Sequence, residues 1–408
     1  MARFFVIAIC IWVTAHLYVG TRLIHGSHLR TRWKIVAWAA LLTMMTLGPS
    51  ALFIRGIPHK GTGLIALEWA SYLSMGFFLI LLPSVLVRDL GWLVGAAVDS
   101  VVAAVRRVSL ARRRVGVPAR SVLPVDPDRR RFLLQSMNVG LVGFSGTLTG
   151  FGVYEARRTP DVVRVDIPIV DLPPDLAGFR IAQITDTHVG PMIRREMMQE
   201  FVAVANALEP DMIAVTGDLA DGYLPEMRPH VEPVADLRAP HGVYFVTGNH
   251  EYYWDYEGWI AEVRRLGLTV LLNEHRVLER GSGRILLAGV TDYSAGRYNL
   301  AAASDPMAAL AGAPRADVKI VLAHQPKSIY EVSDTGYDLQ ISGHTHGGQF
   351  FPWGLFVHLL QPYVAGLHRH GNTWIYVSRG TGYWGPPLRI AAPPEITLLT
   401  LVRGDAAG

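Results

Sequence analysis

The sequence predicts two parts of different fold class: a bundle of membrane-spanning helices over residues 1–156, and an α/β domain over residues 157–408. Two observations support this division. Long apolar stretches occur in the first part, whereas short β-rich runs alternate with amphipathic stretches and turn residues in the second. Half of the 408 residues are hydrophobic, a share at the upper end of the soluble range, so a single uniform globule is not expected.

Four stretches of the first part are candidate transmembrane helices. Residues 4–24, 33–54 and 64–87 are strongly apolar, and each is close to the roughly 20 residues that a helix needs to cross a bilayer. Residues 133–154 are less apolar but carry no charge, and their Gly and Ser residues suit helix packing inside a membrane. We expect the arginine-rich stretch 88–132 to form a basic cytoplasmic loop.

The distribution of basic residues predicts how these helices are oriented. Cytoplasmic loops are enriched in Lys and Arg, and basic residues gather between the first two spans and in residues 88–132. We therefore expect an integral protein of a bacterial inner (cell) membrane, with the chain after about Glu155 on the external face. Residues 128–134, Asp-Arg-Arg-Arg-Phe-Leu-Leu, resemble a twin-arginine export signal, which would agree with this placement. Because the run is internal, it is equally well explained as the positively charged flank of a span.

Charge and cysteine content exclude some classes of protein. The formal net charge is only +4, and after Asp161 acidic and basic residues are interspersed without a basic stripe, so no nucleic-acid partner is expected. The arginine block could by itself bind nucleic acid, but the apolar segments on both sides favour a role in membrane topology. The single cysteine, Cys10, excludes an intrachain disulfide and a thiolate metal cluster.

The second part has the alternating pattern of an α/β domain. Residues 194–208 and 256–266 have apolar side chains at helical spacing and lie among the early strands. The predicted strands cover residues 180–185, 212–216, 243–247, 285–290, 318–323, 339–342, 374–377 and 396–402.

Side chains that can bind metals follow five of these strands directly. Open α/β sheets bind ligands in the loops at the carboxyl ends of their strands, so these side chains are expected to lie close together. Carboxylates and imidazoles suit Mn, Fe or Zn, and a carboxylate can bridge two ions. One such motif alone would more often be a turn or a helix cap, but five in order favour a metal site. In chain order they are Asp186 and His188, Asp218, Asn249 with His250 and Glu251, His324, and His344 with His346.

This ordered set, Asp-x-His, Gly-Asp, Gly-Asn-His-Glu, His and Gly-His-x-His, resembles the calcineurin-like metallophosphoesterases over residues 165–402. Every element of the family pattern is present. Three further runs look like a membrane-associated bacterial branch of that family, namely Gly-Asp-Leu-Ala-Asp-Gly at 217–222, Gly-His-Thr-His-Gly-Gly-Gln at 343–349 and Arg-Gly-Thr-Gly-Tyr-Trp-Gly-Pro-Pro at 379–387. The resemblance implies a four-layer α-β-β-α sandwich that holds two divalent metal ions.

The same resemblance implies a role for each matched residue. A hydroxide shared by the two ions would attack phosphorus. His250 would protonate the leaving oxygen or stabilise the charge on it, and Asp221 and Glu251 would orient the groups around it. One ion would be held by Asp186, His188, Asp218 and His346, and the other by Asp218, Asn249, His324 and His344, with Asp218 as the bridge.

Several histidines fall outside the matched elements, and five of them lie close enough to the pattern to be considered. The matched ligand set is complete without them, so we expect no metal contact from them, although two of them alternate like a ligand pair. They are His241, His275, His358, His368 and His370.

An apolar insertion follows the last matched histidines. Residues 350–367 could form an apolar lip beside the metals, or they could be a structural subdomain or pack against the membrane helices. A lip would make a phospholipid or a lipid-linked phosphoester a candidate substrate. The large apolar side chains of the insertion are Phe350, Phe351, Trp353, Leu355, Phe356, Leu359, Leu360 and Tyr363, and Tyr383 and Trp384 follow soon after.

The leading functional hypothesis is a membrane-anchored enzyme that hydrolyses a phosphodiester or pyrophosphate bond. Two alternatives come from other classes: a protein phosphatase, and a non-catalytic membrane scaffold that retains the metal-binding fold. The intact His250 argues against the scaffold, because a scaffold does not need an acid for a leaving group.

Overall fold

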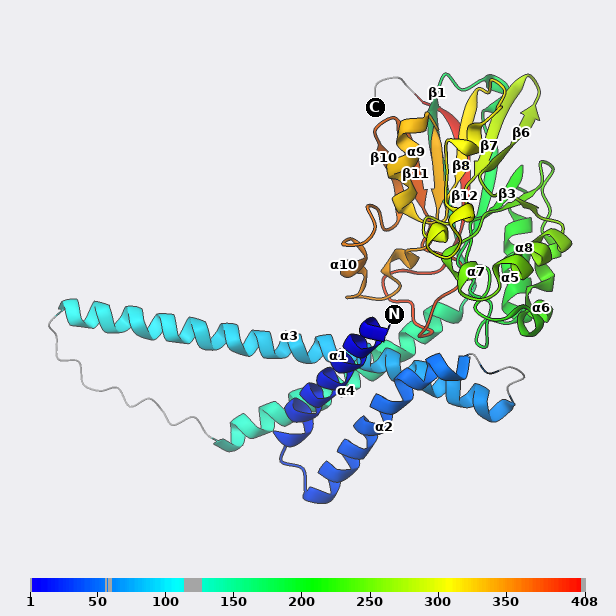
Figure 1. Cartoon of the computed structure of the whole chain (residues 1–408). Coiled ribbons are helices and arrows are strands. Elements are labelled where there is room, and N and C mark those ends of the chain that lie inside the picture. The colour runs from blue at the N-terminus through cyan, green and yellow to red at the C-terminus, as the bar shows by residue number, and fades with distance from the viewer. Residues whose placement is uncertain (1, 56, 58–60, 114–126, 405–408) are drawn as a thin grey trace. The chain divides into compact units, whose positions relative to one another are not determined.

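The computed structural model describes residues 2–55, 57, 61–113 and 127–404. The chain divides into two compact units. We call the first, Met1–Phe53 with Ala70–Gly150, the membrane unit, and the second, Ile54–Trp69 with Phe151–Gly408, the α/β unit. Figure 1 shows the long helices of the first unit in blue to blue-green and the strands of the second in green to red.

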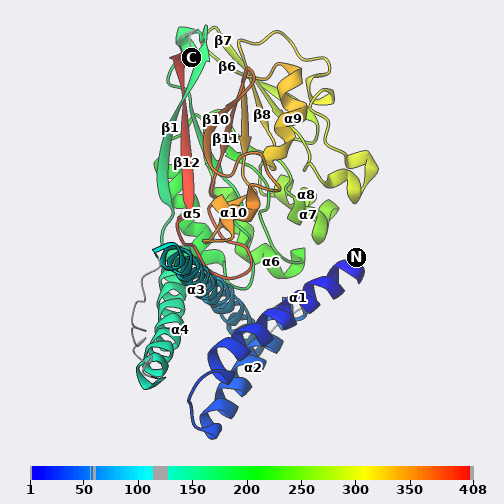
Figure 2. The same cartoon turned by 90° about the vertical axis from the view of Figure 1, so that its left-hand side faces the viewer.

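Long helices make up the described part of the membrane unit, and the ends of three of them (54–55, 62–69 and 151–157) belong to the α/β unit. They are α1 (Ala2–Gly20), which continues into a π-helical turn (Thr21–His25), α2 (Thr31–Arg55), α3 (Thr62–Arg113) and α4 (Pro127–Arg157), and α2 turns back from α1 in Figures 1 and 2. Among the described residues, three helical segments are long and apolar enough to cross a membrane: Val6–His25, Thr31–Ala51 and Thr62–Val105. The fourth predicted span, 133–154, is helical within α4 but is not among these three. Its crossing of a membrane stays a prediction.

The stretch 88–113 is helical, not the loop that we expected from its arginines. It forms the second half of α3, because it contains no proline and is rich in Ala, Leu and Arg, which favour helix. The rest of the predicted loop, 114–126, lies outside the described residues.

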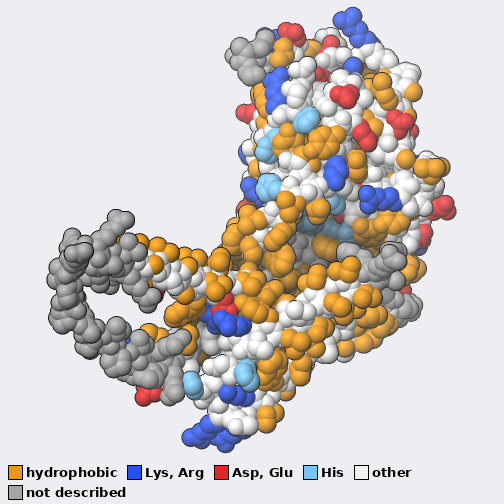
Figure 3. Space-filling view, turned by 60° about the vertical axis from the view of Figure 1, so that its left-hand side comes forward, with side chains coloured by type: hydrophobic (Ala, Val, Ile, Leu, Met, Phe, Trp, Pro, Cys, Tyr) orange, Lys and Arg blue, Asp and Glu red, His pale blue; other side chains and the backbone are white. Residues whose placement is uncertain are grey.

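The membrane helices pack on one another through aromatic side chains. Phe78 of α3 is fully buried and stacks on His16 of α1, with ring centroids 3.4 Å apart. A Cβ atom at Gly48 would come within 2.6 Å of the Trp12 ring, so glycine lets α1 and α2 approach closely. On the outside, these helices expose many large apolar side chains, which Figure 3 shows in orange, as expected of surfaces that face lipid.

Two six-stranded sheets form the centre of the α/β unit. In spatial order, the first contains β1 (Asp161–Val170), β12 (Glu395–Gly404), β2 (Arg180–Ile184), β3 (Met212–Val215), β4 (Val243–Phe245) and β5 (Thr269–Val270). The second contains β10 (Gly366–His370), β11 (Thr373–Val377), β9 (Leu339–Ser342), β8 (Val318–Leu322), β7 (Gly283–Gly289) and β6 (Glu274–Arg280). The α-helices of the unit are α5 (Arg195–Ala207), α6 (Leu224–Val231), α7 (Asn249–Tyr253), α8 (Tyr256–Arg265), α9 (Ile329–Val332) and α10 (Gly354–Val357).

The alternation of side chains along the strands produces four layers. Ile181 of β2 packs in a core between the two sheets, whereas its neighbour Ala182 packs on the outer face with Phe201 of α5. On the second sheet, Leu286 packs outward against Ile329 of α9. The predicted α-β-β-α sandwich is confirmed.

All eight predicted strands are present, and each begins and ends within two residues of its prediction. Four strands were missed. β5 has only two residues, and β1 contains Pro168 and three charged residues, so neither has a strong strand pattern. β6 and β10 are edge strands with polar, partly exposed side chains.

Parallel pairing brings the predicted metal-binding loops together. β2, β3 and β4 are parallel neighbours in the first sheet, and β8 and β9 are parallel neighbours in the second. The loops that leave neighbouring parallel strands at their carboxyl ends lie at the same edge of the sheet.

Candidate metal centre

The loops after β2, β3 and β9 contain backbone conformations that are rare for residues with a side chain. L-residues other than glycine seldom adopt positive φ, and each such residue costs roughly 1–3 kcal/mol. The strained residues are ligands predicted from the sequence, and their backbone conformation turns their side chains toward one another. The residues are Asp186 (φ 55°), His188 (46°), Asp218 (53°), His344 (72°) and His346 (51°).

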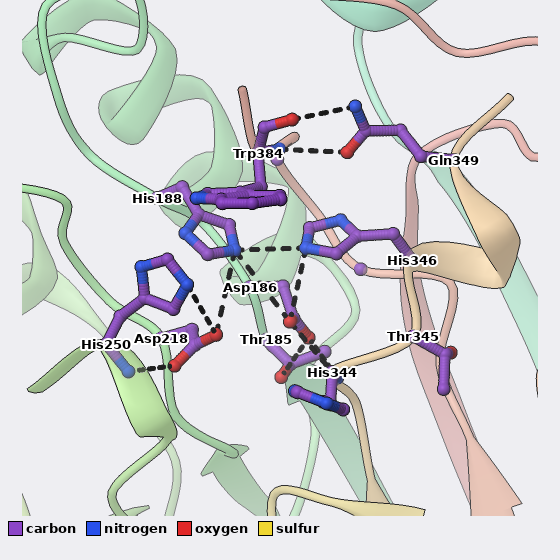
Figure 4. A network of polar contacts seen from close by, with 12 residues as sticks. Thr185, Asp186, His188, Asp218, His250, His344, Thr345, His346, Gln349 and Trp384 are labelled. Carbon is purple, nitrogen blue, oxygen red and sulfur yellow. Dashed lines mark hydrogen bonds and ion pairs between the residues drawn. The ribbon is translucent and has the colours of Figure 1, made fainter. Parts of the chain in front are cut away.

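One group of potential ligands comprises Asp186, His188 and His346, whose ligand atoms all lie within 4.8 Å of one another. The Nε2 atoms of His188 and His346 are 3.0 Å apart, and His346 Nε2 is 3.4 Å from Asp186 Oδ1 (Figure 4). Thr185 Oγ1 and the backbone N–H of His344 donate hydrogen bonds that fix the Asp186 carboxylate. Two imidazole nitrogens this close cannot both present lone pairs unless a proton or a cation lies between them.

A second group comprises Asp218, His324 and His344. His324 Nε2 is 3.2 Å from Asp218 Oδ2 and 3.3 Å from His344 Nδ1. His324 Nδ1 donates to the carbonyl oxygen of Thr216 at 2.7 Å, which orients the ring and turns Nε2 toward the group. A backbone partner of this kind is typical of histidines that ligate metals.

The side-chain oxygen of Asn249 could ligate a metal and has no hydrogen-bond partner among the described residues. The residue is 5% exposed, its Nδ2 donates to Tyr253 Oη at 3.0 Å, and its Oδ1 is buried without a hydrogen bond. A buried carbonyl oxygen left unpaired costs free energy, so its presence here fits a cation that this oxygen would contact.

The Asp218 carboxylate lies between the two groups. Its Oδ2 is 3.8 Å from His188 Nε2 in the first group and 3.2 Å from His324 Nε2 in the second. The backbone N–H of His250 donates to Oδ1 at 2.9 Å and holds the carboxylate in place. This is the position that a bridging ligand would occupy.

The buried charges shift the pKa values of these groups in opposite directions. Burial alone would lower the pKa of His324, but the facing Asp218 carboxylate outweighs it and raises this pKa well above its usual value. The pKa of Asp218 is lowered because the charges of His324 and His250 outweigh the effect of burial. Burial and the neighbouring His324 lower the pKa of His344 to about 4. In the metal-free protein a proton therefore occupies a position that a cation could take.

His250 lies beside these two groups and, with His188 and Asp221, forms a third group whose ligand atoms lie within 4.8 Å of one another. Its Nδ1 donates a hydrogen bond to Asp221 Oδ1, and the same oxygen is 3.3 Å from His188 Nδ1. Its Nε2 is 3.8 Å from Asp218 Oδ2 (Figure 4). The ring is thus held by Asp221, with its other nitrogen directed toward the predicted bridge.

Comparison with known proteins agrees with this geometry. Residues 179–348 match the family model described as calcineurin-like phosphoesterase. An uncharacterised metallophosphoesterase of Helicobacter pylori is 38% identical over 70% of this chain and 76% of its own. The chain belongs to the calcineurin-like metallophosphoesterases. The resemblance inferred from the motifs is confirmed.

Two further relatives show how this metallophosphoesterase compares in length. The metallophosphoesterase YkuE of Bacillus subtilis is 31% identical over 67% of this chain and 97% of its own. A zebrafish protein named transmembrane protein with metallophosphoesterase domain is 37% identical over 63% of this chain. The match spans only 61% of the zebrafish protein.

In this metallophosphoesterase, Glu251 organises the backbone beneath the predicted ligands. The carboxylate is buried and accepts hydrogen bonds from the backbone N–H groups of Asp218 (3.1 Å), Leu219 (2.8 Å) and Gly248 (2.6 Å). Burial and the charge of Asp218 raise its pKa to about 7. Its role as an orienting group for catalysis stays a prediction.

Arg389 is a buried cation that the sequence analysis missed. It is fully buried, and its guanidinium donates to the carbonyl oxygens of His346 (2.8 Å) and Arg379 (2.7 Å), among others, and to His346 Nδ1 (3.1 Å). Burial lowers its pKa to about 10. Nothing in the local sequence distinguishes it from a surface arginine, because most of its partners are backbone carbonyl oxygens within ten residues and His346 lies 43 residues away.

Gln349 fixes the loop that carries Trp384 at the mouth of the centre. Its side-chain amide donates to Trp384 O at 2.8 Å and accepts from Trp384 N at 2.9 Å (Figure 4). The Trp384 ring is 47% exposed and lies edge-on to His250, with centroids 5.8 Å apart. Gln349 belongs to the Gly-His-Thr-His-Gly-Gly-Gln run, but that run does not predict a contact with the backbone of Trp384.

Three of the histidines expected to lie outside the centre have other partners. His275 bonds Ala309 O, while His368 and His370 lie on edge strand β10, where they contact Ala365 O and Tyr363 Oη. The alternation of the last pair reflects a β-strand, and neither belongs to a potential metal group among the described residues.

Proposed function

We propose that this chain is a membrane-anchored phosphoesterase that uses two divalent metal ions (Mn, Fe or Zn) to hydrolyse a phosphodiester or pyrophosphate bond. The observation that carries the proposal is the position of Asp218, whose Oδ2 contacts both groups of potential ligands. Asp186, His188 and His346 would hold one ion, Asn249, His324 and His344 the other, and Asp218 both.

Two bound ions would supply a water of lowered pKa and positive charge that stabilises the transition state. The protein supplies the remaining groups. His250, held through Nδ1 by Asp221, presents Nε2 for proton transfer to the leaving oxygen. Glu251 accepts hydrogen bonds from the backbone N–H groups of Asp218 and Gly248, and Arg389 donates a hydrogen bond to His346 Nδ1. A carboxylate-held histidine of this kind supports a catalytic role over a scaffold role.

The substrate class that the surface favours is a phospholipid or a lipid-linked phosphoester. The segment after the last predicted ligand exposes large apolar side chains, including Phe351 (62%), Leu355 (61%) and Leu359 (78%). The segment stays close to the ligands because Thr345 Oγ1 donates to Val364 O at 2.6 Å. Apolar side chains beside a phosphoester site favour a substrate with acyl chains.

The proposed location is a bacterial inner membrane, with the α/β unit on the external face. The three apolar helical segments support membrane insertion, and the basic residues of the α1–α2 turn and of the stretch after the third segment favour the cytoplasm for both. The external placement therefore also requires the predicted fourth span, residues 133–154, to cross the membrane. Protease treatment of intact spheroplasts should then degrade the α/β unit. If the unit is degraded only after lysis, it lies on the cytoplasmic face and the proposed orientation is wrong.

Hydrolysis of bis-p-nitrophenyl phosphate by the full chain in detergent tests the chemistry. We expect activity with Mn²⁺ that is lost on chelation and in Asp218→Asn, and that persists in His358→Ala, a change at an exposed histidine outside the centre. A metal-loaded protein that does not hydrolyse phosphodiesters, pyrophosphates or phosphopeptides would support the scaffold.

A further inference from the structure

The membrane unit contains a cavity of about 690 Å³. This volume lies within the range of about 300–1,000 Å³ that is common for ligand pockets. The lining comes from the segment between Val19 and Met44 and from α3 and α4, all within the membrane unit. No residue of the metal centre contributes, so a ligand here would be distinct from the substrate of the phosphoesterase.

One end of the cavity is polar and the rest is apolar. The polar lining residues are Ser27, His28 and Arg30 in the turn between α1 and α2, and Gln135 and Asn138 one helical turn apart on α4. The apolar lining includes Leu41 and Met44, which lie three and four turns further along α2, and Phe77 and Leu81 of α3. A cavity with this division suits an amphipathic molecule with one long apolar chain.

Positive charge gathers at the polar end. Asn138 accepts a hydrogen bond from Arg88, which pairs with Asp89 at 2.7 Å. Asp89 also accepts from Arg22 and, at 2.6 Å, from Tyr18. Two guanidinium groups thus share one carboxylate, and the Arg88 side chain is only 7% exposed. Arg88 lies eleven residues after Phe77, about 16 Å along α3, so the charge and the apolar body are separated along the helix.

We propose that this cavity binds one anionic phospholipid, with an acyl chain against Leu41, Met44 and Phe77 and the phosphate beside Arg30 and Asn138. Surplus positive charge among membrane helices is costly unless an anion compensates it. The polar end lies at the α1–α2 turn, which is predicted to be cytoplasmic, and that leaflet carries anionic lipids that attract basic residues. The lipid is a resident ligand that binds the helices together.

Native mass spectrometry of the full-length protein in neutral detergent tests the proposal. Phosphatidylglycerol and phosphatidylcholine with identical acyl chains are offered separately. We expect one retained phosphatidylglycerol and a preference of about fivefold over phosphatidylcholine, the effect of a single basic residue near an anionic headgroup. Melting temperature is measured in parallel, and phosphatidylglycerol should raise it more than phosphatidylcholine does.

Two variants and their matched controls locate the site. Arg30→Gln should abolish the preference for the anionic lipid, whereas Arg32→Gln, two residues away and outside the lining, should retain it. Ala40→Phe places a ring in the cavity and should prevent retention, whereas Ala39→Phe on the exposed side of α2 should not. Equal retention of both lipids by the unaltered protein would overturn the proposal. Unchanged binding in a folded Arg30→Gln or Ala40→Phe protein would overturn it as well.

Discussion

The Asp221 carboxylate accepts a hydrogen bond from Nδ1 of His250. This contact fixes the tautomer of the ring, because a donor at Nδ1 leaves Nε2 either as the acceptor of the neutral imidazole or as the acidic N–H of the imidazolium. The proposed acid is the imidazolium, which the neighbouring carboxylates stabilise.

His250→Gln should therefore reduce kcat according to the leaving group. For an alkyl phosphodiester, loss of a general acid should lower kcat by about 10²–10⁴-fold. For bis-p-nitrophenyl phosphate the loss should be much smaller, because p-nitrophenolate leaves without being protonated. Rates across a series of leaving groups, with His358→Gln as control, measure this dependence. An equal loss for both substrates would indicate that His250 only supports the structure.

Metal binding should become tighter as pH rises. Asp218 raises the pKa of His324 in the metal-free protein, so the folded state holds a proton where a metal would bind. A histidine that ligates a metal must be neutral, so metal binding displaces that proton. Protons compete less with the metal as the pH approaches the raised pKa of His324. Calorimetric titration with Mn²⁺ in buffers of different ionisation enthalpy should show proton release. Binding without proton release would contradict the assignment of His324 as a ligand.

The sequence predicted the strands that carry the site better than the contacts that shape it. Strand β3, for example, is short and fully buried, so it appears as an apolar run that ends in a polar motif. No local pattern indicates the positive φ of Asp186 or the contact of Arg389 with His346, which lies 43 residues away in the sequence. Helix α3 is longer than predicted. The arginines after residue 87 indicated a loop, but the helix continues to Arg113.

Asn249→Ala should weaken one metal site more than the other. Asn249 Oδ1 has no hydrogen-bond partner among the described residues, and we propose that it contacts the ion of the His324 and His344 group. Even changes outside the ligand shell often reduce metal affinity about 10–100-fold, so loss of a ligand should have at least this effect. Metal content after dialysis should fall from two ions to one. Asn299→Ala, at an exposed position, should keep both, and two tightly held ions in Asn249→Ala would exclude Asn249 as a ligand.

Glu251→Gln should destabilise the metal-free protein. The carboxylate accepts three backbone hydrogen bonds with two oxygens, and in glutamine one oxygen becomes an NH₂ group that cannot accept. Buried N–H groups left without acceptors should cost about 1–3 kcal/mol. Denaturant unfolding measures the difference, with Glu257→Gln on the exposed face of α8 as control. An unchanged unfolding midpoint would mean that Glu251 does not organise these loops.

Leu355→Ser with Leu359→Ser should change the choice of substrate. Both side chains are exposed next to the predicted ligands, at 61% and 78%. If acyl chains lie on them, the ratio of kcat/KM for a long-chain phosphodiester to that for bis-p-nitrophenyl phosphate should fall several-fold, because each lost apolar contact of side-chain size is worth ~1 kcal/mol or more. Leu300→Ser, at a leucine that is 84% exposed elsewhere on the same unit, should leave the ratio unchanged. An equal decrease for both substrates would indicate that the segment supports the fold, and equal turnover of long-chain and short-chain diesters by the unaltered enzyme would exclude a lipid substrate.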